Sequence, residues 1–157
     1  MGYYWLDASV LIQAHQGPYN FDIAPGFWNA LSQGAADGHL RSPDMVFQEI
    51  KPGDELARWV KANKSPLFVN ADQAVQTKFG PIAAHVQSSY APPWVVKFLA
   101  GADPWVIAHA QADAGTVVTL ENRLRPAHVK IPIICDKFGI ESISTYEMLK
   151  RLGVKLR

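Results

Sequence analysis

The chain has 157 residues, of which 48% are apolar and 18% charged, and this composition favours a globular domain with its own hydrophobic core over a disordered chain. The formal net charge is only +1, so any binding to nucleic acid must come from a local basic patch. Cys135 is the lone cysteine, which excludes a disulfide within the chain and favours a reducing compartment. We expect a cytoplasmic protein without membrane association, since no signal-peptide pattern and no apolar run near the roughly 20 residues of a membrane span occur.

Apolar runs alternate with helical patterns along the whole chain. In chain order, the patterns predict a strand at 3–7, helices at 9–15 and 27–36, a strand at 40–42, helices at 43–50 and 55–63, a strand at 66–69, helices at 72–90, 94–100 and 103–115, a strand at 116–120, a helix at 131–138, a strand at 140–144 and a helix at 145–152. We expect Ser9 and Ser42 to act as helix N-caps, and the helix at 72–90 to break near Gly80-Pro81. Short apolar strands alternating with helices predict one α/β domain over residues 1–157, with a parallel sheet covered on both faces.

Four acidic residues fall where such a sheet would bring them together. Asp7 and Glu121 each follow an apolar strand, and a carboxylate between apolar segments is costly to desolvate. Asp103 begins the helix that leads into the second of these strands, so it lies at the same edge of the sheet. Glu49 is on the helix after the second strand. Because function gathers at the carboxyl ends of parallel strands, we expect all four carboxylates to converge.

Clustered carboxylates favour a metal site. Four of them within a few ångströms cannot all stay ionised without a compensating charge. Mg²⁺ and Mn²⁺ prefer oxygen ligands, activate water and neutralise charge that develops on a phosphodiester. The sequence therefore predicts that Asp7, Glu49, Asp103 and Glu121 hold one or two such ions and form a catalytic site.

Each acid also has a structural interpretation. An Asp before Pro, as in Asp103-Pro104, is more often an N-cap than a ligand. Glu49 has the alternative of a solvated helix surface, and Glu121 that of a loop. Other cofactors have less support, because the sequence contains no HExxH zinc motif, no GxxxxGK phosphate loop and no GxGxxG dinucleotide motif.

The acidic motifs resemble those of the PIN-domain nucleases. The resemblance rests on Asp7-Ala8-Ser9, Glu49 in VFQEI, Asp103 in ADPWVIAHAQADAG and Thr119-Leu120-Glu121, and it covers nearly the whole chain. The last acid is commonly Asp in that family, whereas Glu121 is longer by one methylene.

The resemblance implies a three-layer α/β/α sandwich with strand order 3-2-1-4-5 and a metal-dependent ribonuclease that cleaves single-stranded RNA. Many small members are toxins of toxin–antitoxin pairs, of the VapC type, so the resemblance also implies a homodimer and a cognate antitoxin protein. The segment 71–101 is longer than in the smallest such toxins and indicates a divergent subfamily. The alternative is a catalytically weak PIN-like module that binds RNA or a protein partner.

Other residues are candidates for supporting roles. Arg123, Arg125 and Lys130, in the segment ENRLRPAHVK, either contact RNA phosphates or belong to a solvated loop. Ser9 and Thr119 either orient ligand carboxylates or serve as a cap and a space-filling residue. Core packing is the favoured role of Trp94 and Trp105, and stacking on RNA bases is the alternative.

Overall fold

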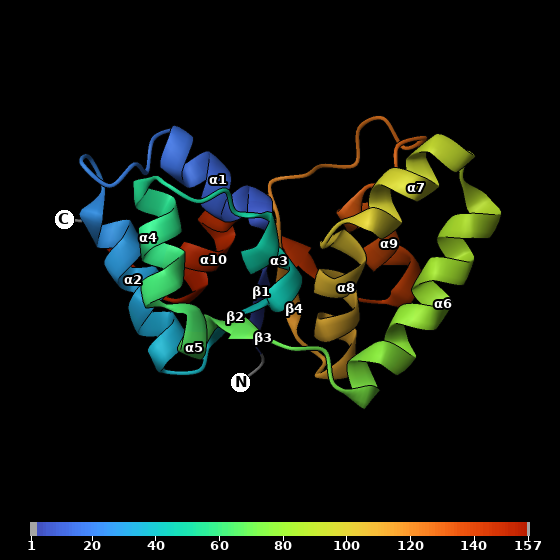
Figure 1. The fold of residues 1–157 in the computed structure, drawn as a ribbon, viewed down its shortest axis with the longest axis horizontal. Coiled ribbons are helices and arrows are strands. Elements are labelled where there is room, and N and C mark those ends of the chain that lie inside the picture. The colour runs from blue at the N-terminus through green and yellow to red at the C-terminus, as the bar shows by residue number, and fades with distance from the viewer. Residues whose placement is uncertain (1–2, 157) are drawn as a thin grey trace.

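A parallel sheet of five strands runs through the middle of the protein (Figure 1). The computed structural model describes residues 3–156. The strands are β1 (Tyr4–Leu6), β2 (Leu40–Pro43), β3 (Phe68–Val69), β4 (Thr116–Val118) and β5 (Ser142–Ile143). Every neighbouring pair is parallel, and the order is β3-β2-β1-β4-β5. The predicted fold class and strand order are therefore confirmed.

Helices cover both faces of this sheet, which completes the three layers (Figure 1). One side carries α1 (Ala8–Gln16), α2 (Pro25–Ala36), α4 (Glu55–Ala62), α5 (Lys64–Leu67) and α10 (Thr145–Arg151). The other side carries α6 (Gln73–Ser89), α7 (Pro92–Ala100), α8 (Asp103–Ala112) and α9 (Ile131–Phe138). The short helix α3 (Asp44–Glu49) follows β2 directly. Within residues 3–156, no helix is long and apolar enough to span a membrane.

The centre of the core lies between the middle strands and α8. Leu6 of β1, Val117 and Val118 of β4 and Ile107 of α8 are all fully buried. Two aromatic residues bind α6 to the outer face of α8, because the rings of Phe79 and Trp105 stack with centroids 4.2 Å apart. Trp105 therefore has the packing role that the sequence favoured.

A buried hydroxyl joins β2 to the end of β1. Ser42 Oγ donates to the carbonyl oxygen of Leu6 at 2.8 Å. Ser42 was predicted to cap a helix, and that prediction is wrong: Ser42 and Pro43 belong to β2, and α3 begins at Asp44. The bond holds Ser42 in the sheet, and its acceptor Leu6 directly precedes Asp7 in the chain.

Other local predictions also needed correction. The expected break at Gly80-Pro81 is absent, because α6 continues past Pro81. Pro81 is exposed while Ile82 and Val86 are buried, so this apolar face maintains a helix that lacks one backbone donor. The strand predicted at 66–69 is half as long, because Leu67 N–H donates to Asn63 and closes the turn of α5.

The turn from α8 into β4 requires a glycine. The helix ends at Ala112, earlier than predicted, and Ala114 adopts a positive φ of 57°. A Cβ on Gly115 would lie 2.8 Å from the carbonyl oxygen of Tyr3. This close approach lets β4 pair with β1, and it thereby brings the residues that follow the two strands together.

Candidate metal centre

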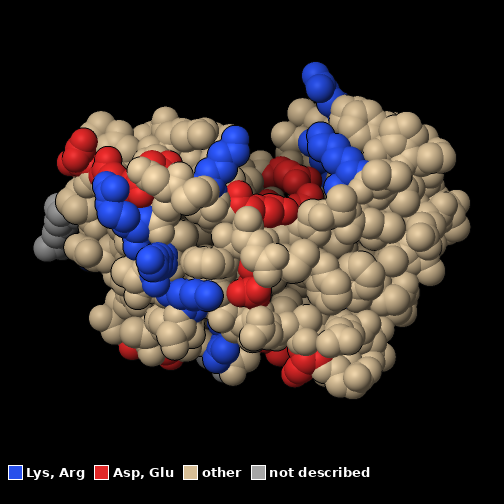
Figure 2. All heavy atoms as spheres, viewed as in Figure 1, with Lys and Arg blue, Asp and Glu red and all other residues tan. Residues whose placement is uncertain are grey.

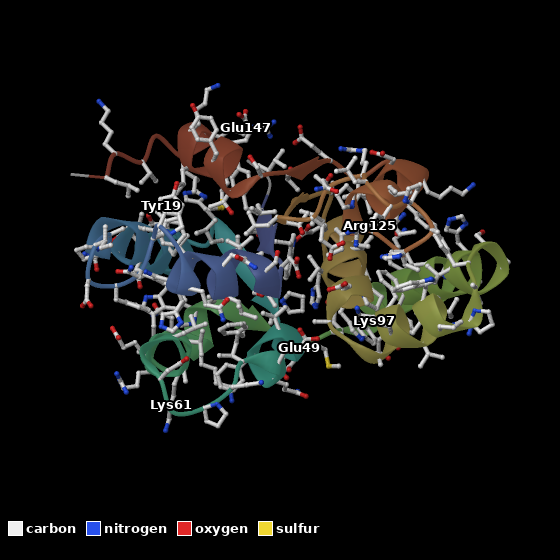
Figure 3. The ribbon with its side chains drawn as sticks, turned by 90° about the horizontal axis from the view of Figure 1, so that it is seen from above. Tyr19, Glu49, Lys61, Lys97, Arg125 and Glu147 are labelled. Carbon is white, nitrogen blue, oxygen red and sulfur yellow. The ribbon has the colours of Figure 1, made fainter. Side chains whose placement is uncertain are left out.

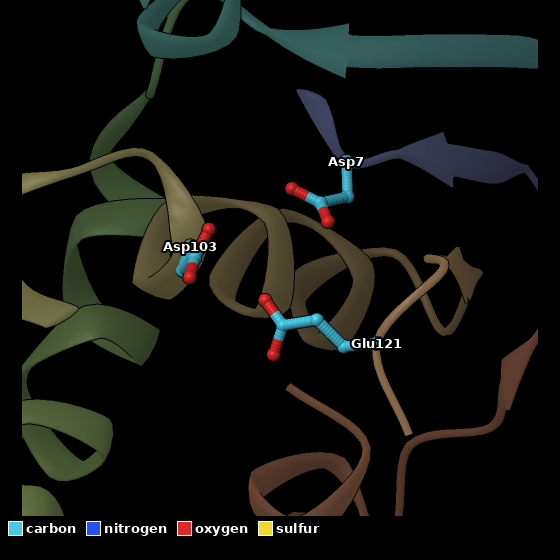
Figure 4. Close-up of side chains that lie close together, drawn as sticks. All are labelled: Asp7, Asp103 and Glu121. Carbon is cyan, nitrogen blue, oxygen red and sulfur yellow. The ribbon is translucent and has the colours of Figure 1, made fainter. Parts of the chain in front are cut away.

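Three acidic residues meet at the carboxyl end of the sheet (Figure 4). Asp7 directly follows β1, Glu121 lies just beyond β4, and Asp103 is the first residue of α8. One carboxylate oxygen from each side chain lies within 4.8 Å of the other two. Figure 4 shows the three side chains pointing toward a common space. The sequence predicted these three residues, and we refer to them as the acid cluster.

Asp7 is the most deeply held member of the cluster. Its side chain is only 2% exposed, and its Oδ2 accepts hydrogen bonds from Ser9 Oγ at 2.7 Å and Thr119 Oγ1 at 2.9 Å. Asp7 is also the N-cap residue of α1, so Ser9 does not have the capping position that was predicted for it. The two hydroxyl groups fix the orientation of the Asp7 carboxylate.

The same hydroxyl groups connect Asp7 with the segment that carries Glu121. Thr119 Oγ1 accepts from the Glu121 amide at 3.1 Å, and Ser9 Oγ accepts from the Leu120 amide at 3.2 Å. Glu121 Oε1 in turn accepts from the Ile131 amide at 3.0 Å, at the start of α9. Glu121 is therefore held at its backbone and at one carboxylate oxygen.

Asp103 is positioned by the start of α8 without capping it. The N-cap residue is Ala102, and the Asp103 side chain makes no capping hydrogen bond. The N-cap alternative for Asp103 is thus wrong. A side chain in the first helical turn leaves its carboxylate free to point into the cluster, and the positive end of the helix dipole favours a negative charge there.

Burial raises the pKa of all three carboxyl groups, and repulsion by neighbouring carboxylates adds to the rise for Asp103 and Glu121. Burial, followed by the charges of Asp7, Glu121 and Glu49, raises the pKa of Asp103 to about 8. Burial is also the main cause that raises the pKa of Asp7 and that of Glu121. Three carboxylates so placed are fully ionised near neutral pH only if a cation compensates them.

Glu49 lies next to the cluster but not in it. It is the last residue of α3 and is exposed, and its Oε1 accepts from the Ala102 amide at 2.7 Å. Gly101 permits this approach, because a Cβ there would lie 3.0 Å from that oxygen. Glu49 thus supports the start of α8, and its charge raises the pKa of Asp103.

A cavity of about 370 Å³ opens beside the acid cluster. Its wall contains Glu49, Asp103 and Glu121, together with Trp94, Lys97, His128 and Lys130. Figure 2 shows acidic side chains inside a hollow of the molecular surface, with basic side chains near its rim. The cavity therefore combines the carboxylates with cationic and aromatic groups.

The basic residues that line the cavity differ from those predicted to contact RNA phosphates. Of the three predicted phosphate contacts, Lys130 lines the cavity and the two arginines do not. Arg123 instead forms two hydrogen bonds with Asp136, at 2.8 and 2.9 Å. Arg125 is an exposed loop residue. Lys97 of α7 was not among the predicted residues, but it lines the same cavity as Glu49 (both labelled in Figure 3). Its only signal in the sequence is its place shortly before Gly101 and Asp103.

Comparison with known protein families matches residues 4–156 to a domain of unknown function, DUF4411. The chain belongs to this family. A search of the curated proteins gave no match. The chemistry of the DUF4411 domain must therefore be inferred from the residues of its own site.

The donor set of this DUF4411 chain fits a hard divalent cation. The acid cluster offers carboxylate oxygens alone, and hydroxyl donors already orient one of its members. Mg²⁺ and Mn²⁺ are the ions that prefer such ligands, whereas zinc sites in proteins usually include His or Cys. Asp7, Asp103 and Glu121 would hold the ion, and Glu49 borders the same space.

Proposed function

We propose that the protein is a metal-dependent endoribonuclease that hydrolyses phosphodiester bonds in single-stranded RNA. The observation that carries the proposal is the acid cluster, in which three carboxylates with raised pKa values lie within 4.8 Å of one another. Burying like charges at the end of a sheet destabilises the fold, and a metal-binding function would account for their presence. The choice of RNA follows from the resemblance of the motifs around Asp7, Asp103 and Glu121 to PIN-domain nucleases.

The residues of the site have separate roles in this proposal. A bound Mg²⁺ or Mn²⁺ would activate a water molecule and neutralise charge on the phosphodiester. Asp7, Asp103 and Glu121 would hold the ion, while Ser9 and Thr119 keep the Asp7 carboxylate oriented. Lys130 and Lys97 supply positive charge to a phosphate in the cavity.

Cleavage of a fluorescent single-stranded RNA with Mn²⁺, with Mg²⁺ and with EDTA tests the proposal. We expect cleavage only with metal. In Asp7→Asn and Asp103→Asn the activity should fall by more than the roughly 10- to 100-fold typical of residues outside the ligand set. The double variant should be hardly worse than either single one, because the two ligands act as a unit. Asp22→Asn, at an exposed position between α1 and α2, is the matched control.

Two results would contradict the proposal. The first is cleavage that persists in EDTA or in Asp7→Asn at the wild-type rate. The second is the absence of cleavage with every metal, together with tight binding of RNA or of a protein. The second result would favour the alternative, a module that binds RNA or a protein without cleaving RNA. One observation supports this alternative: Glu49 and Glu121 each use one carboxylate oxygen to accept a hydrogen bond from a backbone amide.

The proposed cellular role is that of a toxin in a toxin–antitoxin pair, acting as a cytoplasmic homodimer and silenced by a cognate antitoxin protein. This role follows from the family resemblance and extends the proposed activity. Expression of the wild-type chain should then arrest growth, whereas expression of Asp7→Asn should not. Normal growth with an enzyme that is active in vitro would contradict the toxin role and leave the nuclease proposal intact.

A further inference from the structure

The cavity beside the acid cluster has a second wall, whose aromatic residues have no role in the proposed hydrolysis. This wall comes from α7, which contributes Trp94 and Lys97, and from the segment before α9, which contributes His128 and Lys130. At about 370 Å³ the cavity lies at the lower end of the volumes of small-ligand sites. A single nucleotide unit is a ligand of suitable size.

The aromatic part of the wall is a preformed stack. The rings of Trp94 and His128 lie with centroids 3.7 Å apart and planes 21° apart. Both residues line the cavity, and both are only half-buried. Aromatic side chains of this kind bind unpaired bases with little sequence preference, because every base has a π face. The stack therefore suits a base that has left its duplex partner.

The cationic part of the wall consists of Lys97 and Lys130. Lys97 Nζ is 5.8 Å from the centre of the Trp94 ring, and its charge lowers the pKa of Asp103 and of Glu121. Lys130 also lowers the pKa of Glu121. Neither lysine takes part in an ion pair within residues 3–156, so both ammonium groups are available to a phosphate.

We propose that this cavity is a nucleotide subsite, in which a base stacks on the Trp94–His128 pair and the attached phosphate is held by Lys97 and Lys130 beside the acid cluster. The inference rests on the proposed function and specifies its substrate: RNA with an unpaired base next to the cleaved bond. A paired base within a duplex cannot present its face to such a stack.

Binding separates the two parts of this subsite when it is measured in EDTA by fluorescence anisotropy. The probes are fluorescein-labelled decauridine and a decamer with the same RNA backbone that lacks bases. The wild-type protein should bind decauridine about 10-fold more tightly than the abasic probe, because stacking adds to phosphate binding. The comparison uses the wild-type chain, so it is independent of whether any variant folds.

Substitutions then assign the effect to residues. Trp94→Leu and His128→Leu should weaken decauridine binding by about 10-fold and leave the abasic probe unaffected, and Trp94→Phe should retain most of the affinity. Lys97→Gln and Lys130→Gln should weaken the binding of both probes by similar factors and reduce the salt dependence. The matched controls are Tyr146→Leu on α10 and Lys61→Gln on α4, because both residues are exposed and neither lines the cavity. Figure 3 shows Lys61 away from Lys97.

Equal affinity of the wild-type protein for the two probes would overturn the subsite. So would unchanged decauridine binding in a folded Trp94→Leu variant, or a loss of affinity that is confined to the lysine variants. These outcomes differ from a failure of the proposed function. A protein that cleaves RNA but binds both probes equally keeps the nuclease proposal, whereas an inactive protein with base-dependent binding keeps the subsite.

Discussion

Asp103 links the stability of the metal-free protein to pH. Its pKa is raised to about 8, mainly by burial, whereas that of an unfolded Asp is about 3.9. The folded state therefore binds a proton more tightly than the unfolded state between these values. In that interval the free energy of unfolding falls as pH rises, by up to about 1.4 kcal/mol per pH unit for one proton.

Buried His109 has the opposite effect on the pH dependence of stability, and it acts over a different pH range. Burial lowers its pKa to about 4, below the value near 6.5 of an unfolded His. Because the unfolded state then binds the additional proton, the contribution of His109 to stability is present above pH 6.5 and is lost as pH falls toward 4. Between pH 6.5 and 8 the carboxyl groups of the acid cluster therefore dominate the pH dependence.

We expect the melting temperature of the metal-free protein to fall between pH 6.5 and 8. Asp103→Asn should remove most of this fall, because an amide neither titrates nor repels Asp7 and Glu121. Thermal melts monitored by circular dichroism in EDTA measure both effects, with Asp22→Asn as the control. An unchanged slope in Asp103→Asn would show that the raised pKa of this carboxyl does not control the stability.

The sequence was sufficient to predict the acids of the cluster and the two hydroxyl groups, of Ser9 and Thr119, that hydrogen-bond Asp7. Asp7 and Glu121 follow apolar strands, so the geometry of a parallel sheet brings them to one edge. Two other contacts depend on how distant segments pack against each other. They are the stack of Trp94 with His128 and the pairing of Arg123 with Asp136. The spacing of residues in the sequence does not predict such packing. Contacts made by side chains outside the acidic motifs are thus the part of the site that sequence patterns do not predict.

At the scale of elements, local patterns failed where a distant contact opposed them. Ser42-Pro43 has the pattern of a helix start, but the buried bond from Ser42 to Leu6 places both residues in β2. Pro81 has the pattern of a helix break, but the apolar face of Ile82 and Val86 continues α6. In both cases the deciding residue lies elsewhere in the chain or on another face of the helix.

Glu49 allows the support of α8 to be separated from metal binding. Glu49→Gln keeps an acceptor oxygen for the Ala102 amide, so stability should change little, whereas Glu49→Ala leaves this buried donor unpaired and should cost about 1–3 kcal/mol. If Glu49 acts only through α8, Glu49→Gln should retain metal affinity within a few fold. Chemical denaturation and isothermal titration with Mn²⁺ measure the two quantities.

Asp103→Asn is the comparison for this pair of Glu49 variants. It should lose most of its Mn²⁺ affinity at little cost in stability, because its side chain points into the acid cluster and makes no capping bond. A loss of affinity in Glu49→Gln as large as that in Asp103→Asn would instead make Glu49 a fourth ligand, as the sequence predicted.

For the whole molecule, the site exists only when the fold is complete. The acid cluster combines the ends of β1 and β4 with the start of α8, three segments that are far apart in the chain. The alternation of short apolar strands with helices was sufficient to predict the five-stranded parallel sheet that brings them together. The unfolded chain offers no such arrangement of oxygens, so metal binding should stabilise the folded state.

Divalent metal should therefore raise the melting temperature. At a free concentration of about 100 times the dissociation constant, binding adds about 2.7 kcal/mol, which corresponds to roughly 5–10 °C for a domain of this size. Asp7→Asn should melt at a higher temperature than the wild type in EDTA, because it removes a buried carboxyl group that repels its neighbours when ionised, and it should respond little to metal. Differential scanning fluorimetry with Mg²⁺, Mn²⁺ and EDTA measures both shifts.

The Asp7→Asn variant separates the charge of Asp7 from its role in packing, because Asn retains an oxygen that can accept a hydrogen bond from Ser9 or Thr119. The expected result is a higher melting temperature in EDTA together with the loss of the shift that metal causes. An undiminished metal response in Asp7→Asn would exclude this residue as a ligand.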